Sequence, residues 1–158
     1  MCILQLERMY SMKKAMKLLA VLFTALFVLL GCAKEESSTF ELKKEGLVST
    51  LVYYYKGDVV TKQSARNEFE ISKLPISEEE ALQQIKENTD AYNAVKGVTA
   101  TVESKDGFII QSLTVDYSVA KLSELKAAFP HDFTGSGEKV SFKVSKEALI
   151  NAGYAEKK

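Results

Sequence analysis

Two separate parts of the chain have the residue patterns of β-strands: the first is β-branched and aromatic on both faces, and the second alternates apolar and polar residues. In the first part, a run of β-branched and aromatic residues reaches a turn at Lys56-Gly57-Asp58 and continues as a second extended stretch. In the second part, Asp106-Gly107 forms the turn. Each part predicts an antiparallel β-hairpin. The four predicted strands span 47–55, 59–71, 98–103 and 109–117.

A helical spacing of apolar residues separates the two hairpins. Ser77 and Glu80 form a capping box, and the apolar positions continue to Gly97, so the pattern predicts a helix over 78–96. The expected remaining elements are a short helix ended by Pro130, a loop over 131–138, a short strand over 139–144 and a helix from Ser145 through Asn151 that Gly153 stops.

The order of these elements predicts the fold class. Two hairpins interleaved with helices indicate an α+β fold, with a mainly antiparallel sheet built from two β-hairpins and two to three helices packed on one face. Residues 40–158 have the length of one self-sufficient domain, and the sequence has no internal repeat.

The amino-terminal segment, residues 1–31, has the pattern of a secretory signal peptide. Three lysines precede an uncharged apolar run over 18–30. Thirteen helical residues reach roughly 20 Å, less than the ~30 Å hydrocarbon core of a bilayer. We therefore expect a cleaved signal rather than a permanent span, with an uncleaved signal anchor as the alternative. Residues 1–11 fit no part of a signal peptide, which favours a translation start at Met9, Met12 or Met16.

The apolar run ends at Leu29-Leu30-Gly31-Cys32, which resembles the lipobox of bacterial lipoproteins. This resemblance implies signal-peptide cleavage between Gly31 and Cys32 and a diacylglyceryl thioether on Cys32. Two or more acyl chains hold a protein stably on a bilayer. The polar residues 33–39 predict a short solvated tether, so the expected organisation is a signal over 1–31, a lipidated cysteine and tether over 32–39, and the domain.

Charge and cysteine content narrow the possible functions. The formal net charge is zero, but the leader is basic and the mature part is therefore acidic, with its lysines interspersed among acids. Such a surface lacks the basic stripe that binds a phosphate backbone, so we expect no nucleic-acid partner. After maturation Cys32 is the only cysteine and its sulfur is alkylated, which excludes a disulfide, a thiolate nucleophile or a cysteine metal site.

Three groups of residues invite a chemical interpretation that the sequence does not favour. His131 and Asp132 lie near Ser136, which allows an envelope hydrolase as an alternative, but adjacent residues seldom orient each other as a catalytic pair. Gly135-Ser136-Gly137 lacks the context of a P-loop and predicts a flexible turn. The acids 78–80 point in different directions on a helix and favour its dipole, so we expect no metal site and no cofactor.

The tyrosines at 53, 54 and 55 are the most distinctive side chains. Strand residues alternate, so Tyr54 faces away from Tyr53 and Tyr55. One face is then core and the other is a candidate recognition surface, although aromatic pairs also stabilise ordinary sheets.

The lipobox, the run Tyr55-Lys56-Gly57-Asp58, the tripeptide Lys62-Gln63-Ser64 and the segment 145–153 together resemble the YehR-like lipoproteins. That family is located in the envelope and has no assigned function. The resemblance implies an α+β domain outside the cytoplasm, and it transfers only Cys32, as the lipid site.

The expected function is that of a lipid-anchored cell-envelope protein, held on the membrane through Cys32. We expect a non-enzymatic binding or accessory module for an envelope protein or small ligand, with a hydrolase or a purely structural surface protein as alternatives. Ala33 is not the aspartate that resembles an inner-membrane retention signal. The expected location is the outer membrane of a two-membrane cell or the outer surface of the cell membrane in a one-membrane cell.

Overall fold

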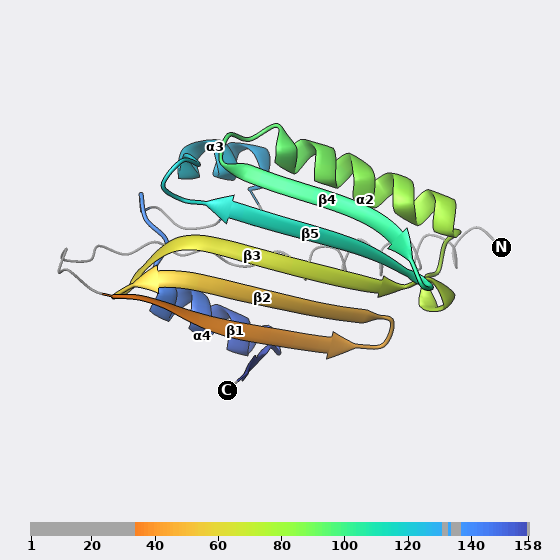
Figure 1. The fold of residues 1–158 in the computed structure, drawn as a ribbon, viewed down its shortest axis with the longest axis horizontal. Coiled ribbons are helices and arrows are strands. Elements are labelled where there is room, and N and C mark those ends of the chain that lie inside the picture. The colour runs from red at the N-terminus through yellow and green to blue at the C-terminus, as the bar shows by residue number, and fades with distance from the viewer. Residues whose placement is uncertain (1–33, 131–132, 134–136, 158) are drawn as a thin grey trace.

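A computed structural model describes residues 34–130, 133 and 137–157, which are built on one six-stranded antiparallel sheet (Figure 1). The strands follow the order β4-β5-β3-β2-β1-β6. The strands are β1 (Glu35–Lys44), β2 (Leu47–Lys56), β3 (Val59–Glu70), β4 (Val98–Lys105), β5 (Phe108–Asp116) and β6 (Ala155–Lys157). The helices are η1 (Ile71–Lys73), α2 (Glu78–Asn93), α3 (Leu122–Ala128) and α4 (Phe142–Asn151).

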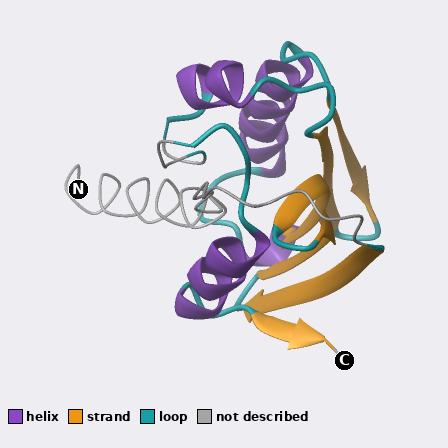
Figure 2. Cartoon of the chain, turned by 90° about the vertical axis from the view of Figure 1, so that its left-hand side faces the viewer, coloured by secondary structure: helices purple, strands orange, loops and turns teal. Residues whose placement is uncertain are grey.

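The α-helices of the described residues, α2, α3 and α4, lie on one side of the sheet (Figure 2). This arrangement confirms the predicted α+β class with helices on one face. Both predicted hairpins are present, as β2 with β3 and as β4 with β5, and each turn lies where its glycine was expected. We call the side that carries the helices the covered face and the other side the open face.

The polar residues 35–39, predicted as a tether, instead form the first half of β1. They pair with the end of β2, beginning at Glu35 opposite Lys56. Their polarity misled the prediction because this half of β1 is largely exposed, whereas Phe40 and Leu42 further along are buried. The sheet therefore begins three residues after Cys32.

Helix α2 begins with the predicted capping box. The Ser77 hydroxyl accepts a hydrogen bond from the Glu80 N–H, and the Glu80 carboxylate accepts one from the Ser77 N–H. The helix ends at Asn93, before the predicted end at residue 96. The Asn93 amide turns onto strand β4, where it donates to the carbonyl of Ala100 at 2.8 Å and accepts from its N–H at 2.7 Å. The side chain thus supplies the partner that an adjacent strand would provide.

The carboxy-terminal part departs from the prediction. Instead of a strand over 139–144, the structure has one isolated bridge between Val59 and Ser141. Ser141, not Ser145, caps α4, because its hydroxyl accepts from the Val144 N–H at 3.3 Å. Ser145 lies inside the helix and is fully buried. After Gly153 stops the helix with a positive φ of 96°, the unpredicted strand β6 pairs with β1.

Helix α3 lies where the short helix was predicted and ends at Ala128, two residues before Pro130. The loop predicted over 131–138 lies largely outside the described residues. Two apolar clusters fill the space between the sheet and the helices. The larger includes Phe40, Leu51 and Tyr53, and the smaller includes Phe69 and Ile85. Polar side chains lie between them on the covered face.

Candidate functional site

The three consecutive tyrosines of β2 have different surroundings. Tyr53 is fully buried on the covered face, and its ring lies 6.1 Å from that of Phe40 and 6.2 Å from that of Phe142. Burial raises the pKa of Tyr53 far above its ordinary value, and the neighbouring Ser145 hydroxyl opposes this shift. Tyr55 is half-buried and stacks on Phe142 at a centroid distance of 3.7 Å. These two tyrosines hold α4 against the sheet and lie on the covered face.

Tyr54 lies on the open face, as the strand alternation predicts. The Lys62 ammonium lies 4.3 Å from the centroid of its ring, in cation–π geometry. Asp116 pairs with Lys62 across the β3–β5 ladder. Hydrogen bonds from Ser118 and the nearby Lys62 charge lower the pKa of the Asp116 carboxyl, so it is ionised at neutral pH. Tyr54 is therefore the single tyrosine of the three that reaches the open face.

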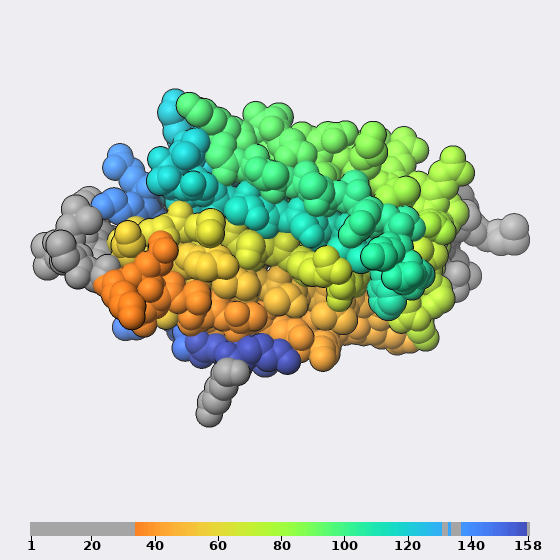
Figure 3. Space-filling model, viewed as in Figure 1, coloured from red at the N-terminus to blue at the C-terminus, as the bar shows by residue number. Residues whose placement is uncertain are grey.

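The open face is a broad surface that no helix crosses (Figures 2 and 3). Small hydroxyl residues dominate its centre. One cross-strand row places Thr99, Thr114, Ser64, Val52 and Thr39 side by side, and the next row contains Thr101, Ser112, Arg66, Thr50 and Glu41. Most of these side chains in β1, β2, β3 and β5 are half-buried by their neighbours rather than by another element.

Several charged residues on the open face form ion pairs. Arg66, at the centre of the sheet, contacts Glu68 through two nitrogens at 2.8 and 3.0 Å. Glu41 contacts Lys157 at 2.7 Å and Lys43 at 3.2 Å, and the hydrogen bond from Lys157 is the main cause of its lowered pKa. Exposed pairs of this kind add little stability. The contact with Glu68 fixes the direction of the Arg66 guanidinium.

The covered face carries a ladder of buried polar side chains that the sequence analysis missed. The Ser49 hydroxyl donates to Asn67 at 2.8 Å, the Asn67 amide donates to Gln111 at 3.3 Å, and the Gln111 amide donates to Thr89 on α2 at 3.0 Å. At the other end, the Tyr154 hydroxyl lies 3.0 Å from that of Ser49. The ladder therefore connects α2, three strands and the segment after α4.

One signal in the sequence marks this ladder. In three strands a polar residue interrupts the apolar covered-face positions, as Ser49 does between Leu47 and Leu51, and β3 carries a second one, Gln63. The strand pairing is needed to see that Ser49, Asn67 and Gln111 fall in one row. These three polar residues thus become a continuous set only in the folded sheet.

The remaining candidate residues divide into two groups. Gly31, Cys32, His131, Asp132, Gly135 and Ser136 lie outside the described residues. Glu80 belongs to the capping box, and Glu78 accepts a hydrogen bond from Ser104 at 2.6 Å. Within the described ranges, no group of three or more histidine, cysteine or acidic residues is placed to hold a metal ion.

Exposed apolar side chains are scattered rather than gathered. The large ones in the described part of the chain are Phe108, Val119 and Ile150, which are 37, 44 and 46% exposed and lie on three different elements or turns. No helix in the portion that the structure describes is long and apolar enough to span a bilayer.

A single antiparallel sheet with helices against one face and the other face bare defines a two-layer α+β domain. The chain belongs to the family described as a protein of unknown function, DUF1307, whose profile matches residues 36–155. The resemblance to YehR-like lipoproteins is confirmed.

Three similar proteins are each named as an uncharacterized lipoprotein. The chain is 35% identical to the uncharacterized lipoprotein Lin0239 of Listeria innocua over 94% of its length and 98% of that protein. It is 32% identical to the uncharacterized lipoprotein Lmo0207 of Listeria monocytogenes over the same shares. It is 26% identical to the uncharacterized lipoprotein YehR of Escherichia coli, over 89% of the chain and 94% of that protein. These relatives are lipoproteins by name.

Two solved structures share the fold. The NMR structure of Escherichia coli YehR superposes with a TM-score of 0.63 and 20% identity, covering 80% of this chain and 93% of that one. The NMR structure of a protein from Streptococcus pneumoniae superposes with a TM-score of 0.55 and 15% identity, covering 85% and 93%. At these identities the likeness supports the fold alone.

Proposed function

We propose that this chain is a lipid-anchored cell-envelope protein that binds a protein partner through the open face of its sheet and does not catalyse a reaction. The observation that carries the proposal is the bare, hydroxyl-rich face. Five strands spaced about 4.8 Å apart and about ten residues long cover roughly 700–800 Å². That area is close to the ~800 Å² that one partner contributes to a standard protein interface.

The chemistry of this face favours a protein over a small ligand. Small molecules bind in concave sites that enclose most of their surface, which a broad sheet face does not provide. Hydroxyl groups such as Thr50, Ser64 and Ser112 both donate and accept hydrogen bonds, so they suit the mixed polar groups of a protein surface. Arg66, held in place by Glu68, adds a fixed fork of donors at the centre.

Attachment to the membrane is supported by the lipobox at Cys32 and by the relatives that are named lipoproteins. The test is mass spectrometry of the amino-terminal peptide from protein made in a bacterial host. We expect a peptide that starts at Cys32 and carries a diacylglyceryl group. A Cys32→Ala variant should leave the membrane fraction, and an unmodified thiol at Cys32 would refute the proposed anchor.

Site-specific photocrosslinking in living cells tests the binding surface. A crosslinking residue at Ser64, in the centre of the open face, should capture a defined partner, whereas one at Gln83, exposed on α2, should not. An Arg66→Ala change should reduce the capture from Ser64. If both positions capture the same proteins in the same amounts, or if Arg66→Ala has no effect, the open face is not the binding site.

A further inference from the structure

The position of β1 limits the distance between the lipid and the sheet. Cys32 precedes Glu35, the first residue of β1, by three positions. Three Cα–Cα steps span at most about 11 Å. If Cys32 is lipidated as proposed above, the end of the sheet where β1 begins is held close to the membrane surface, at a distance comparable to the Debye length of about 10 Å at 0.1 M salt. We call this end of the domain the anchor end.

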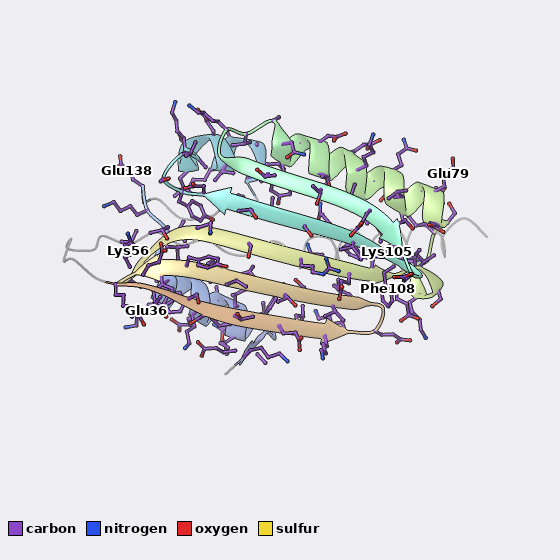
Figure 4. The ribbon with its side chains drawn as sticks, viewed as in Figure 1. Glu36, Lys56, Glu79, Lys105, Phe108 and Glu138 are labelled. Atoms are coloured by element: carbon purple, nitrogen blue, oxygen red, sulfur yellow. The ribbon has the colours of Figure 1, made fainter. Side chains whose placement is uncertain are left out.

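Several segments far apart in sequence meet at the anchor end. Lys56, the last residue of β2, lies opposite Glu35 in the β1–β2 ladder. Asp58 accepts hydrogen bonds from Ser141 at 2.8 Å and from the Lys143 N–H at 2.7 Å, which brings the start of α4 to the same place. Figure 4 labels Glu36, Lys56 and Glu138 at this end and Glu79, Lys105 and Phe108 at the opposite end.

The two ends differ in charge. The carboxylates at the anchor end are Glu35, Glu36, Asp58, Asp116, Glu124 and Glu138. Asp58 is bonded as above, Glu35 accepts from Thr61 at 3.0 Å, Asp116 accepts from Ser118 and Glu124 pairs with Lys121 at 3.2 Å. Glu36 and Glu138 are exposed. Exposed lysines surround them. These lysines are Lys34, Lys56, Lys62, Lys96, Lys121, Lys139 and Lys143, one more than the carboxylates at this end.

Acidic residues outnumber lysines at the opposite end. They are Glu45, Glu68, Glu70, Glu78, Glu79, Glu80, Glu87, Glu103 and Asp106, against Lys43, Lys44, Lys73, Lys86 and Lys105. An anionic membrane therefore favours the anchor end over the opposite one.

We propose that the anchor end binds anionic lipid headgroups through its own exposed lysines. The strands then run away from the membrane surface, and the open face is directed parallel to the membrane. Each lysine close to an anionic surface is worth a factor of about five in affinity for it. With β3 spanning 12 residues at about 3.3 Å each, the opposite end stands roughly 40 Å above the headgroups. The open face is then accessible to partners anchored in the same membrane.

The absence of tryptophan from the sequence makes a direct test possible. Val119→Trp places a single reporter on the turn before α3, at the anchor end, and Phe108→Trp places one at the opposite end. Full-length lipidated protein is reconstituted in vesicles of phosphatidylcholine and phosphatidylglycerol that carry brominated lipids, which quench nearby tryptophan. We expect strong quenching of the Val119→Trp protein and none of the Phe108→Trp protein. A Ser123→Trp protein, with its reporter exposed on α3, provides a second reading if Val119→Trp does not fold.

Matched lysine variants test the electrostatic part. Replacing Lys56, Lys139 and Lys143 by glutamine should weaken the headgroup binding by up to about a hundredfold at low salt and reduce the quenching of Val119→Trp. Replacing Lys73, Lys86 and Lys105 by glutamine should leave it unchanged. Equal quenching at both ends, or equal effects of the two triple variants, would overturn the proposal. Loss of lipid anchoring is recognised separately, because the unmodified protein then fails to float with the vesicles.

Discussion

The two faces of the sheet use similar polar residues under opposite constraints. On the covered face, Ser49, Asn67 and Gln111 are buried and each is bonded to another side chain. On the open face, Ser64 lies on the same strand as Asn67, and Ser112 lies on the same strand as Gln111. Both serine side chains are partly exposed to water. A buried polar group without a partner is costly, whereas a hydrated one is nearly neutral. The same residue type is therefore structural on one face and available for recognition on the other.

The most severe test of this comparison replaces neighbouring residues on opposite faces. Leu51 is 1% exposed on the covered face, and Val52 is half-buried on the open face. We expect Leu51→Ala to lower the free energy of unfolding by about 2–5 kcal/mol, because it leaves a cavity in the larger core cluster. Val52→Ala should lower it by less than about 1 kcal/mol. Urea unfolding followed by circular dichroism measures both, and equal losses would mean that the open face is covered in solution.

The polar ladder gives the next largest expected effect. Asn67→Ala removes the acceptor of Ser49 and the donor to Gln111, so we expect a loss of about 1–3 kcal/mol in the free energy of unfolding. Ser64→Ala, on the open face of the same strand, serves as the control. Its free energy of unfolding should stay within about 0.5 kcal/mol of the parent value. A harmless Asn67→Ala would show that the ladder is not needed for the fold.

Alkaline pH probes the buried phenols. Burial raises the pKa of Tyr53, Tyr117 and Tyr154 above the ordinary value of 10. These groups ionise first in the unfolded chain, so their contribution is complete below pH 10 and declines above it by about 1.4 kcal/mol per pH unit for each phenol. Tyr154→Phe should make this decline shallower by that amount, as measured by urea unfolding at a series of pH values. Parallel declines in parent and variant would contradict a buried, protonated Tyr154.

The smallest expected effect is on the open face. A double-mutant cycle between Lys62→Ala and Tyr54→Leu should give a coupling energy of only about 0.5–1 kcal/mol, because the cation–π contact is solvated. The measurement is again the free energy of unfolding. A coupling of several kcal/mol would indicate that the pair is shielded from water, and would remove the contrast between the faces.

Local sequence patterns were sufficient for the elements whose residues match their surroundings. The alternation in β2 and β5 and the capping box at Ser77 are decided within a few residues, and both appear as predicted. The failures depend on distant partners. Ser141 and Ser145 are equally plausible caps by residue type, but contacts with Asp58 place Ser141 at the start of α4, and Ser145 packs beside Tyr53.

The same reason limits what the sequence could say about the candidate site. Alternation correctly separates Tyr54 from its two neighbours, but it cannot tell which face the helices cover. The row of hydroxyl residues across the open face exists only through strand pairing, as Ser64 meets Thr114 on one side and Val52 on the other. Polar residues at the start of β1 belong to the sheet because of their partners in β2, not because of their own propensity.

The Asn93 side chain affects how copies of this protein can pair through their sheet edges when they are held on one membrane. Proteins restricted to a membrane meet side by side far more often than proteins in bulk solution, and an exposed strand edge would let their sheets join into a continuous ribbon. At Ala100 the hydrogen-bonding groups of the outermost strand β4 are already taken by an amide from the same chain. A neighbouring copy therefore finds no free partner at that point, which hinders the addition of its strand to this edge.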